Sequence, residues 1–196
     1  MHEVLPRLLT HLSQGRPSIT PEQQAAVAMI LRQGKTGGEM LVIQRAERAH
    51  DPWSGHMALP GGRSELTDND LVDTALREVF EEVGWQLKEM AEYVGSLPAI
   101  PIRARGRFQG GSVVPLVFAL QHEAPWHFNP DEVVDALWLP LAHVLSGEIN
   151  AMHAYSREKG VTMSVPAYRV GHQAIWGLTY HMIGLLLEVV LEDIRK

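Results

Sequence analysis

The sequence contains no cysteine among its 196 residues. Disulfide bonds, thiolate metal sites and a cysteine nucleophile are therefore excluded. It also lacks a long basic run, and its formal net charge is -6. Proteins that bind nucleic acid usually carry a basic footprint, so we expect no nucleic-acid partner.

Long hydrophobic segments are missing as well. The longest apolar run, residues 182–187, is far too short to span a bilayer, and Glu188 follows it. The first fifteen residues have neither a basic start nor an apolar run of signal-peptide length. We therefore expect a cytoplasmic protein with no membrane partner.

The composition is that of a globular protein, with 45% hydrophobic and 20% charged residues. The length fits one domain, which we predict to cover residues 1–196. Within it, residues 1–22 are predicted to form an N-terminal helix and a linker, because apolar residues recur at helical spacing from Val4 to Leu12 and Gly15, Pro17 and Pro21 follow.

Compact apolar runs predict strands along the rest of the chain. A glycine-rich turn between the first two runs predicts a hairpin, and residues 98–111 are predicted to be a loop. Residues 140–145 are predicted to be a short helix. The predicted strands cover residues 25–31, 40–43, 93–97, 113–120, 136–139 and 165–170. Strands interleaved with few helices favour a mixed α/β or an α+β sandwich.

The last segment, residues 172–196, is predicted to form a C-terminal helix. It is apolar on most faces, and such a helix is usually buried. It must pack either on the sheet or on another subunit. The second alternative is the basis for a homodimer hypothesis.

Acidic residues crowd the stretch from Leu59 to Trp85. Its helix is predicted to begin near residues 68–70 and to end at Gly84. Glu78, Glu81 and Glu82 lie at positions i, i+3 and i+4, so they share one helical face. Like charges at this spacing repel one another, which indicates that a cation offsets the repulsion.

The residue types in this stretch fit a divalent cation and a phosphate. Mg²⁺ prefers oxygen ligands, usually a few carboxylates together with substrate phosphate and water. Arg77 cannot bind a metal, but it can orient a carboxylate. Gly61 and Gly62 permit a close backbone approach that a Cβ atom would block, and so can expose amide groups to a phosphate.

These residues resemble the Nudix box, G-x5-E-x7-R-E-U-x-E-E-x-G-U, where U is aliphatic. Matching places are occupied by Gly62, Arg77, Glu78, Val79, Glu81, Glu82, Gly84 and Trp85. Three departures are visible. The distance from Gly62 to Arg77 is one residue longer, Asp68 or Asn69 stands near the place of the first glutamate, and Trp85 replaces an aliphatic residue. We assign Asp68 no role.

The resemblance implies a Nudix-type α/β/α sandwich around a mixed β-sheet, and hydrolysis of a diphosphate linkage with Mg²⁺ or Mn²⁺. It implies that Glu78, Glu81 and Glu82 bind metal or act as base, with Arg77 beside them. Glu132 lies in a late loop from which related enzymes supply a base or a metal ligand. For the small-molecule diphosphate substrate, we expect contacts with Arg45, Gly61, Gly62 and Arg105.

Within this family, the longer box and the late segment Ile175-Trp176-Gly177-Leu178-Thr179 look like the coenzyme A diphosphatases. An upstream motif of that branch is matched at Arg45, Ala46, Gly55 and the Pro-Gly-Gly turn. Asp51, however, stands where its second arginine is expected. A nucleoside diphosphate sugar such as ADP-ribose, or a nucleoside triphosphate, is therefore the alternative substrate. A remote alternative is a Nudix-fold binding module without catalysis.

Overall fold

The computed structural model describes residues 12–35, 37–49, 51, 53–104, 107–156 and 162–194. The predicted N-terminal helix lies outside the described residues, except for its last residue. Leu12 is buried, and Ser13 forms an antiparallel bridge with Ser96. This contact ties the segment before the first strand to the body of the protein.

Eight strands of the described chain form one mixed sheet. The two central strands are β1 (Gln23–Gln33) and β7 (Arg107–Leu120), which run parallel to each other, whereas the other pairs are antiparallel. The order along the main path is β3-β2-β1-β7-β5, and β4, β6 and β8 pair with β1, β7 and β2. The remaining strands are β2 (Gly38–Arg45), β3 (Met57–Ala58), β4 (Gly61–Arg63), β5 (Ala91–Ser96), β6 (Ile100–Ala104) and β8 (Val133–Pro140).

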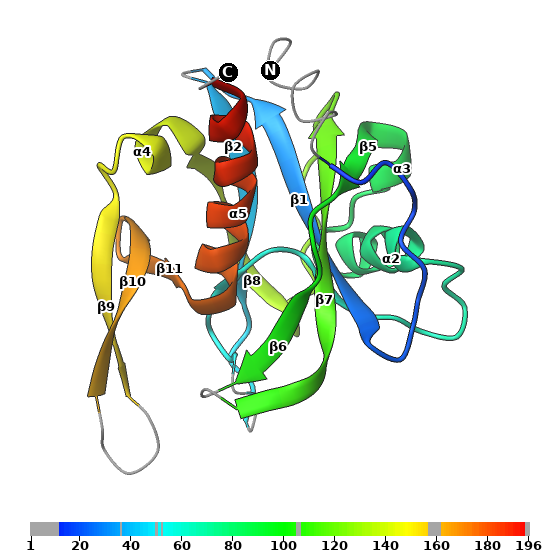
Figure 1. Ribbon diagram of the computed structural model, residues 1–196, viewed down its shortest axis with the longest axis horizontal. Coiled ribbons are helices and arrows are strands. Elements are labelled where there is room, and N and C mark those ends of the chain that lie inside the picture. The colour runs from blue at the N-terminus through cyan, green and yellow to red at the C-terminus, as the bar shows by residue number, and fades with distance from the viewer. Residues whose placement is uncertain are drawn as a thin grey trace.

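Strand β1 divides the core into two layers because successive side chains of a strand point to opposite faces. Ala26, Ala28 and Ile30 pack with helix α2 (Leu71–Val83), whereas Met29 and Leu31 belong to the cluster that includes helix α5 (Gly177–Ile194). Figure 1 shows the two helices on opposite sides of the sheet. The predicted α/β/α sandwich around a mixed sheet is confirmed.

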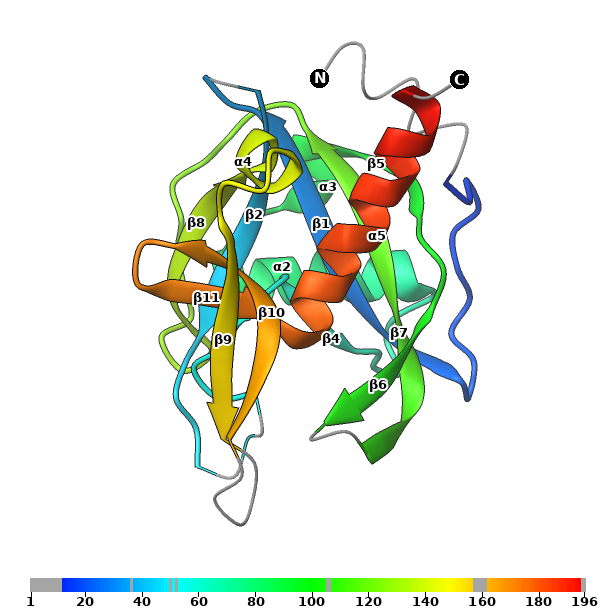
Figure 2. The ribbon, with the colours of Figure 1, turned by 60° about the vertical axis from the view of Figure 1, so that its left-hand side comes forward.

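A second, smaller sheet lies beside α5, as Figure 2 shows. In the described chain it contains β9 (Asn150–Ser156), β10 (Thr162–Val170) and β11 (Gln173–Trp176), all antiparallel. Strand β9 was not predicted. The C-terminal helix was predicted to begin too early, because residues 173–176 pair with β10 and the chain turns at Gly177, where φ is +64°.

The predicted loop at residues 98–111 was also wrong in part. Strand β6 pairs with the beginning of β7, so these residues contribute a hairpin to the main sheet. Pro101 lies within β6, and a proline is tolerated in an edge strand, where its missing N–H is not needed for pairing. A short helix, α3 (Leu87–Met90), was missed, whereas α4 (Leu141–Leu145) agrees with the prediction.

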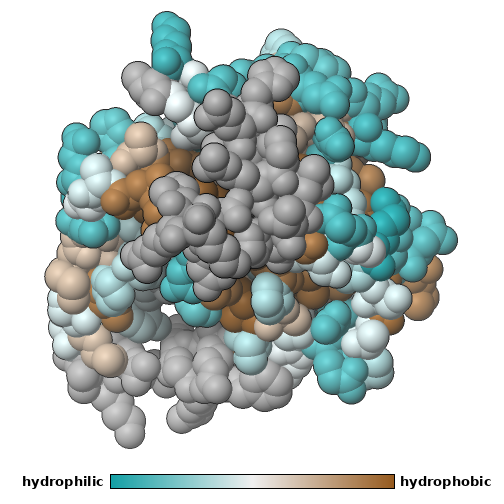
Figure 3. All heavy atoms as spheres, turned by 45° about the horizontal axis from the view of Figure 1, so that its top comes forward, coloured by the Kyte–Doolittle hydropathy of each residue, from teal (hydrophilic) through white to brown (hydrophobic). Residues whose placement is uncertain are grey.

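Helix α5 packs on the main sheet, which was one of the two alternatives for its apolar surface. Met182, Ile183 and Leu186 are almost fully buried there. Within the described residues, no helix has the length and hydrophobicity required to cross a membrane. On the face drawn in Figure 3, hydrophobic residues form separate patches among hydrophilic ones. The homodimer hypothesis stays a prediction.

Candidate active site

Helix α2 carries the acidic face, and both of its ends are capped as predicted. The Asp70 side chain accepts hydrogen bonds from the Val72 and Asp73 amides, 2.9 and 3.0 Å away. At the other end, Gly84 adopts φ +77°, and its N–H donates to the Phe80 carbonyl. A left-handed residue at this position favours glycine. These caps fix the limits of the helix and so the direction in which its glutamates point.

Arg77 connects the acidic face to the loop before the helix. Its Nη1 atom lies 3.0 Å from a carboxylate oxygen of Glu78 and 3.0 Å from one of Glu81. Its Nη2 atom donates to the Arg63 carbonyl at 2.8 Å and to Asp68 at 3.1 Å. The hydrogen bond with Asp68 is the main cause of a raised Arg77 pKa. Arg77 therefore stays positively charged and holds Glu78 and Glu81 in place by hydrogen bonds.

Asp68 has a structural role that the sequence did not reveal. Its side chain is only 4% exposed, and it accepts hydrogen bonds from Arg77, from the Thr74 hydroxyl and from the Glu65 amide. Burial would raise its pKa, but the hydrogen bonds from Arg77 and the other donors hold it below its usual value. Asp68 stays ionised and keeps Arg77 in place. Our expectation that it has no role is corrected in this respect.

Glu82 is the most buried member of the acidic face, at 3% exposure. Its Oε2 atom accepts a hydrogen bond of 2.9 Å from the Gly61 amide. Gly61 has φ +147°, and a Cβ atom there would collide with the Ala26 carbonyl and with Val27. Burial raises the pKa of Glu82 to about 8, although the Gly61 hydrogen bond acts in the opposite direction. A carboxylate in this position is stabilised by any cation that reaches it.

Glu78 lies directly against the glycine turn, the segment 60–62 at which the chain enters strand β4 and pairs with β1. Its carboxylate occupies the space that a Cβ atom of residue 62 would take, so the contact requires Gly62. Burial is the main cause of a raised Glu78 pKa, and the charge of Glu132 adds to the shift, as it does for Glu82. The structure thus brings Glu132 into the electrostatic environment of the helix. Its own nearest cation is Arg48, at 3.5 Å.

The donor set has the composition that Mg²⁺ or Mn²⁺ requires, namely carboxylate oxygens without sulfur. Within the described chain, no three acidic or histidine side chains are already gathered at metal-binding positions. Glu78 and Glu81 instead face Arg77, and Glu82 faces Gly61. The cradle at Gly62 and the desolvated carboxylate of Glu82 nevertheless fit a cation, which would compete with Arg77 for the oxygens of Glu78 and Glu81.

Arg45 is the last residue of β2. Its positive charge lowers the pKa of Glu82, which opposes the larger effect of burial. Its Nη2 atom pairs with Asp51 at 2.8 Å. Its Nε atom is buried and has no hydrogen-bond partner. Asp51 also accepts from the Trp53 amide at 2.9 Å, which fixes the turn. The other arginine predicted to contact substrate, Arg105, lies outside the described residues.

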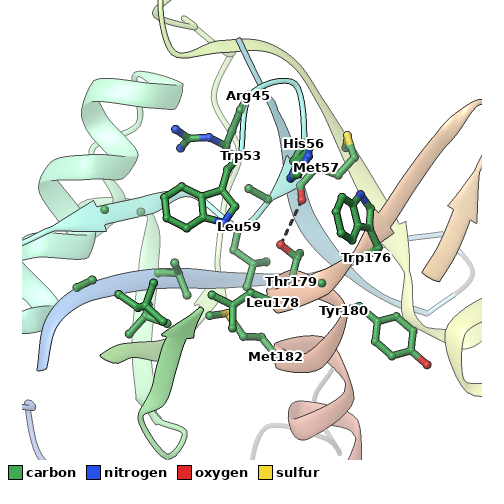
Figure 4. Close-up of a pocket in the computed structure, with 18 of the residues that line it drawn as sticks. Arg45, Trp53, His56, Met57, Leu59, Trp176, Leu178, Thr179, Tyr180 and Met182 are labelled. Carbon is green, nitrogen blue, oxygen red and sulfur yellow. Dashed lines mark hydrogen bonds between the residues drawn. The ribbon is translucent and has the colours of Figure 1, made fainter. Parts of the chain in front are cut away.

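A cavity of about 630 Å³ opens beside the glycine turn. Gly61, Gly62 and Arg45 line one part of it, and its other walls come from the small sheet and the first turn of α5. Figure 4 shows Trp53 and Trp176 on two sides of this space, with Leu178 and Met182 below them in this view. The Thr179 hydroxyl donates to the Met57 carbonyl.

Sequence reasoning missed this cavity. Trp176 and Thr179, which were not predicted to contact substrate, both line the cavity. Gly61, Gly62 and the acidic helix are close together in the sequence, whereas Trp176 is more than a hundred residues after Gly62. A sequence signal for this part of the cavity is the pair Trp176-Gly177, an aromatic residue followed by a glycine where the last helix begins.

Comparison with known proteins places the chain in a family. Residues 22–159 match the NUDIX domain. The chain therefore belongs to the Nudix family. The family and its hydrolase relatives indicate a pyrophosphohydrolase, an enzyme that cleaves phosphoanhydride bonds.

Individual relatives support the family and leave the substrate open. The chain is 37% identical over 150 residues to the uncharacterized protein C14C4.10c of Schizosaccharomyces pombe, covering 74% of this chain but only 46% of that protein. It is 33% identical to the uncharacterized Nudix hydrolase NudL of Salmonella heidelberg, covering 91% of both chains. A MutT/nudix family protein from Enterococcus faecalis has a similar fold, with a TM-score of 0.50 and 19% identity, over 100% of this chain and 75% of that one.

Proposed function

We propose that the chain is a Mg²⁺- or Mn²⁺-dependent Nudix hydrolase that cleaves the diphosphate linkage of coenzyme A or its derivatives. The observation that carries the proposal is the acidic face of α2, where the buried Glu82 meets the Gly61 amide at the edge of the cavity. The ionised form of a carboxylate desolvated to this degree is strongly stabilised by a neighbouring cation. A glutamate with a purely structural role would not need such a cation.

In the proposed reaction, the oxygen of a water molecule bonds to one phosphorus, and the bond from that phosphorus to the bridging oxygen breaks. The bridging oxygen leaves with the bonding electrons as part of the second phosphate monoester. The two protons of the water pass to the product phosphates or to solvent. A divalent cation, when bound, polarises the phosphoryl oxygen and lowers the pKa of the attacking water.

The side chains have distinct roles in this proposal. Glu78, Glu81 and Glu82 would hold the cation, and Glu82 or Glu132 would take the proton of the water. Arg77 is a positioning residue because it touches both Glu78 and Glu81. Gly61 and Gly62 allow the backbone to pack directly against β1 and Glu78, which places the cavity that they line beside these carboxylates.

The matched substitution Glu82→Gln tests the proposal. Glutamine keeps an acceptor for the Gly61 amide but loses the charge, so we expect the turnover number to fall about 10²- to 10⁴-fold while the fold is retained. Glu89→Gln, an exposed residue of α3, is the control. A Glu82→Gln variant with full activity would contradict the assignment.

The second candidate is the same chemistry on a nucleoside diphosphate sugar or a nucleoside triphosphate. The Arg45–Asp51 pair favours it, because Asp51 neutralises a cation that would otherwise be available to a further phosphate of the substrate. Specificity constants for coenzyme A, ADP-ribose and nucleoside triphosphates, measured side by side, distinguish the two. Ligand binding without hydrolysis of any of them would instead favour a non-catalytic module.

A further inference from the structure

The cavity beside the glycine turn is built from two parts of the chain. One wall is β1 and the Gly-Gly turn, which lie inside the matched NUDIX domain. The opposite wall is β10, β11 and the beginning of α5, which all follow residue 159, where the match ends. What this second wall recognises is therefore a property of the C-terminal segment and not of the catalytic helix.

Charge is distributed unevenly along the cavity. Among the described residues that line it, the permanently charged side chains are Arg45 and Arg63, and both accompany the glycines that contact Glu82 and Glu78. The remaining wall is dominated by apolar side chains, including Leu59, Leu178 and Met182. An anionic group is favoured at the first end, and an uncharged apolar group at the second.

The apolar end is poorly suited to a planar nucleobase. The ring of Trp176 is already surrounded by His56, His153 and Tyr155, whose ring centroids lie 4.7, 5.0 and 4.6 Å from it. The Thr179 hydroxyl is committed to the Met57 carbonyl at 3.2 Å. Among the described residues at this end, few groups remain to stack on a base or to read its polar edge, whereas Trp53 lies at the opposite end, beside Arg45.

The same end suits a flexible chain. Three methionines, Met57, Met163 and Met182, line the cavity together with aliphatic residues. Methionine side chains are unbranched and adapt to occupants of irregular shape. The size of the cavity is within the range that accommodates a small-molecule ligand.

We propose that this cavity binds an uncharged, flexible apolar chain attached to the diphosphate of the substrate, and that Met163 and Leu178 select it. The diphosphate lies at the Gly61–Gly62 end, and the chain extends towards α5. This inference rests on the proposed function for the position of the diphosphate, but not for the chemistry of the apolar wall.

A series of adenosine diphosphate alkyl esters tests the subsite. The methyl, butyl and octyl esters share the nucleotide and the diphosphate and differ only in the length of the chain. We expect the specificity constant for hydrolysis with Mg²⁺ to rise about twofold to fourfold for each added methylene until the apolar end is filled.

Two variants and one control locate the effect. Met163→Trp narrows the cavity from β10, at a side chain that is 38% exposed, so the substitution should not unfold the protein. Leu178→Trp narrows it from α5. The control is Met152→Trp, the same change on the neighbouring strand β9, at a residue that does not line the cavity. We expect the octyl-to-methyl ratio of specificity constants to fall at least tenfold in both cavity variants and to be retained in the control.

Calorimetric binding of the octyl and methyl esters of a methylene-bridged, non-hydrolysable analogue separates the subsite from the reaction. Tighter binding of the octyl ester that is lost in Met163→Trp supports the subsite, even if no ester is hydrolysed and the proposed function fails. Hydrolysis of all esters at equal rates, with equal binding, would overturn the subsite while the proposed function stands. An equal loss of the octyl preference in Met152→Trp would also overturn it.

Discussion

The acidic face of α2, which lies against the glycines at one end of the cavity, and the apolar wall formed by β10, β11 and α5 are encoded in different ways. The acidic face is local: Arg77, Glu78, Glu81 and Glu82 lie within six consecutive positions. The apolar wall is assembled only when residues near position 170 pack beside residues near position 60. Under the proposed function, hydrolysis depends on the short helix, whereas the selection of substrate depends on a tertiary surface.

The largest expected difference between the two regions is in how they affect the pH dependence of the free energy of unfolding, measured without metal. Burial raises the Glu82 pKa from 4.5 to about 8 in the folded protein. The folded state therefore holds a proton that the unfolded state has released, and this stabilisation is complete below pH 4.5 and is lost as the pH rises to about 8. The slope is at most about 1.4 kcal/mol per pH unit.

Urea denaturation in a chelating buffer measures this slope. We expect the free energy of unfolding of the wild type to fall relative to that of Glu82→Gln between pH 5.5 and 8, because glutamine does not titrate. The difference between the two proteins removes the contribution of His56, whose pKa burial lowers. Met163→Trp in the apolar wall should retain the wild-type slope. A constant difference between wild type and Glu82→Gln would contradict the burial of an ionisable Glu82.

A smaller effect is expected where the acidic face is held by the loop before it. Asp68→Asn removes the charge that keeps Arg77 in place, and we expect a loss of about 1–3 kcal/mol in the free energy of unfolding. The turnover number should fall about tenfold because Glu78 and Glu81 lose a fixed partner. Glu65→Gln is the control, since the Glu65 side chain is 62% exposed and its contact with Arg77 is long, at 4.0 Å. Equal losses in both variants would remove the special role of Asp68.

The smallest effect concerns the charge at the junction of the two regions. Asp51→Asn keeps an acceptor for the Trp53 amide but releases the Arg45 guanidinium. We expect the preference for coenzyme A over its analogue without the 3′-phosphate to rise about twofold to fivefold, as for a partly exposed ion pair. The ratio of the two specificity constants measures this change. An unchanged ratio would show that Asp51 does not influence substrate choice.

The same contrast explains what could be predicted from the sequence. Helix α2, its caps and the hairpin of β1 and β2 were predictable because Asp70, Gly84 and the glycines at 37 and 38 act on neighbouring residues. Strand β6 was missed because Pro101 is tolerated only through the edge position of the strand, which a sequence does not display.

Asp68 was misjudged, and the position of Trp176 in the cavity was not predicted, for a related reason. Asp68 matters through Arg77, nine positions later, and through the Thr74 hydroxyl, so its value depends on how the loop folds back on the helix. Trp176 lies beside His56 and Tyr155, which come from distant strands and loops. Local patterns predicted the acidic face of α2, whereas contacts between distant segments decided which residues line the cavity.

The most direct test of the account is hydrolysis of coenzyme A and of the adenosine diphosphate alkyl esters in ¹⁸O-labelled water, followed by mass spectrometry of both products. We predict one labelled oxygen per cleavage, present in only one of the two phosphate monoesters, dependent on Mg²⁺ or Mn²⁺ and reduced at least a hundredfold by Glu82→Gln. No labelled monoester from any of these diphosphates, or labelling that Glu82→Gln leaves unchanged, would contradict the claim that the acidic face of α2 carries out the hydrolysis.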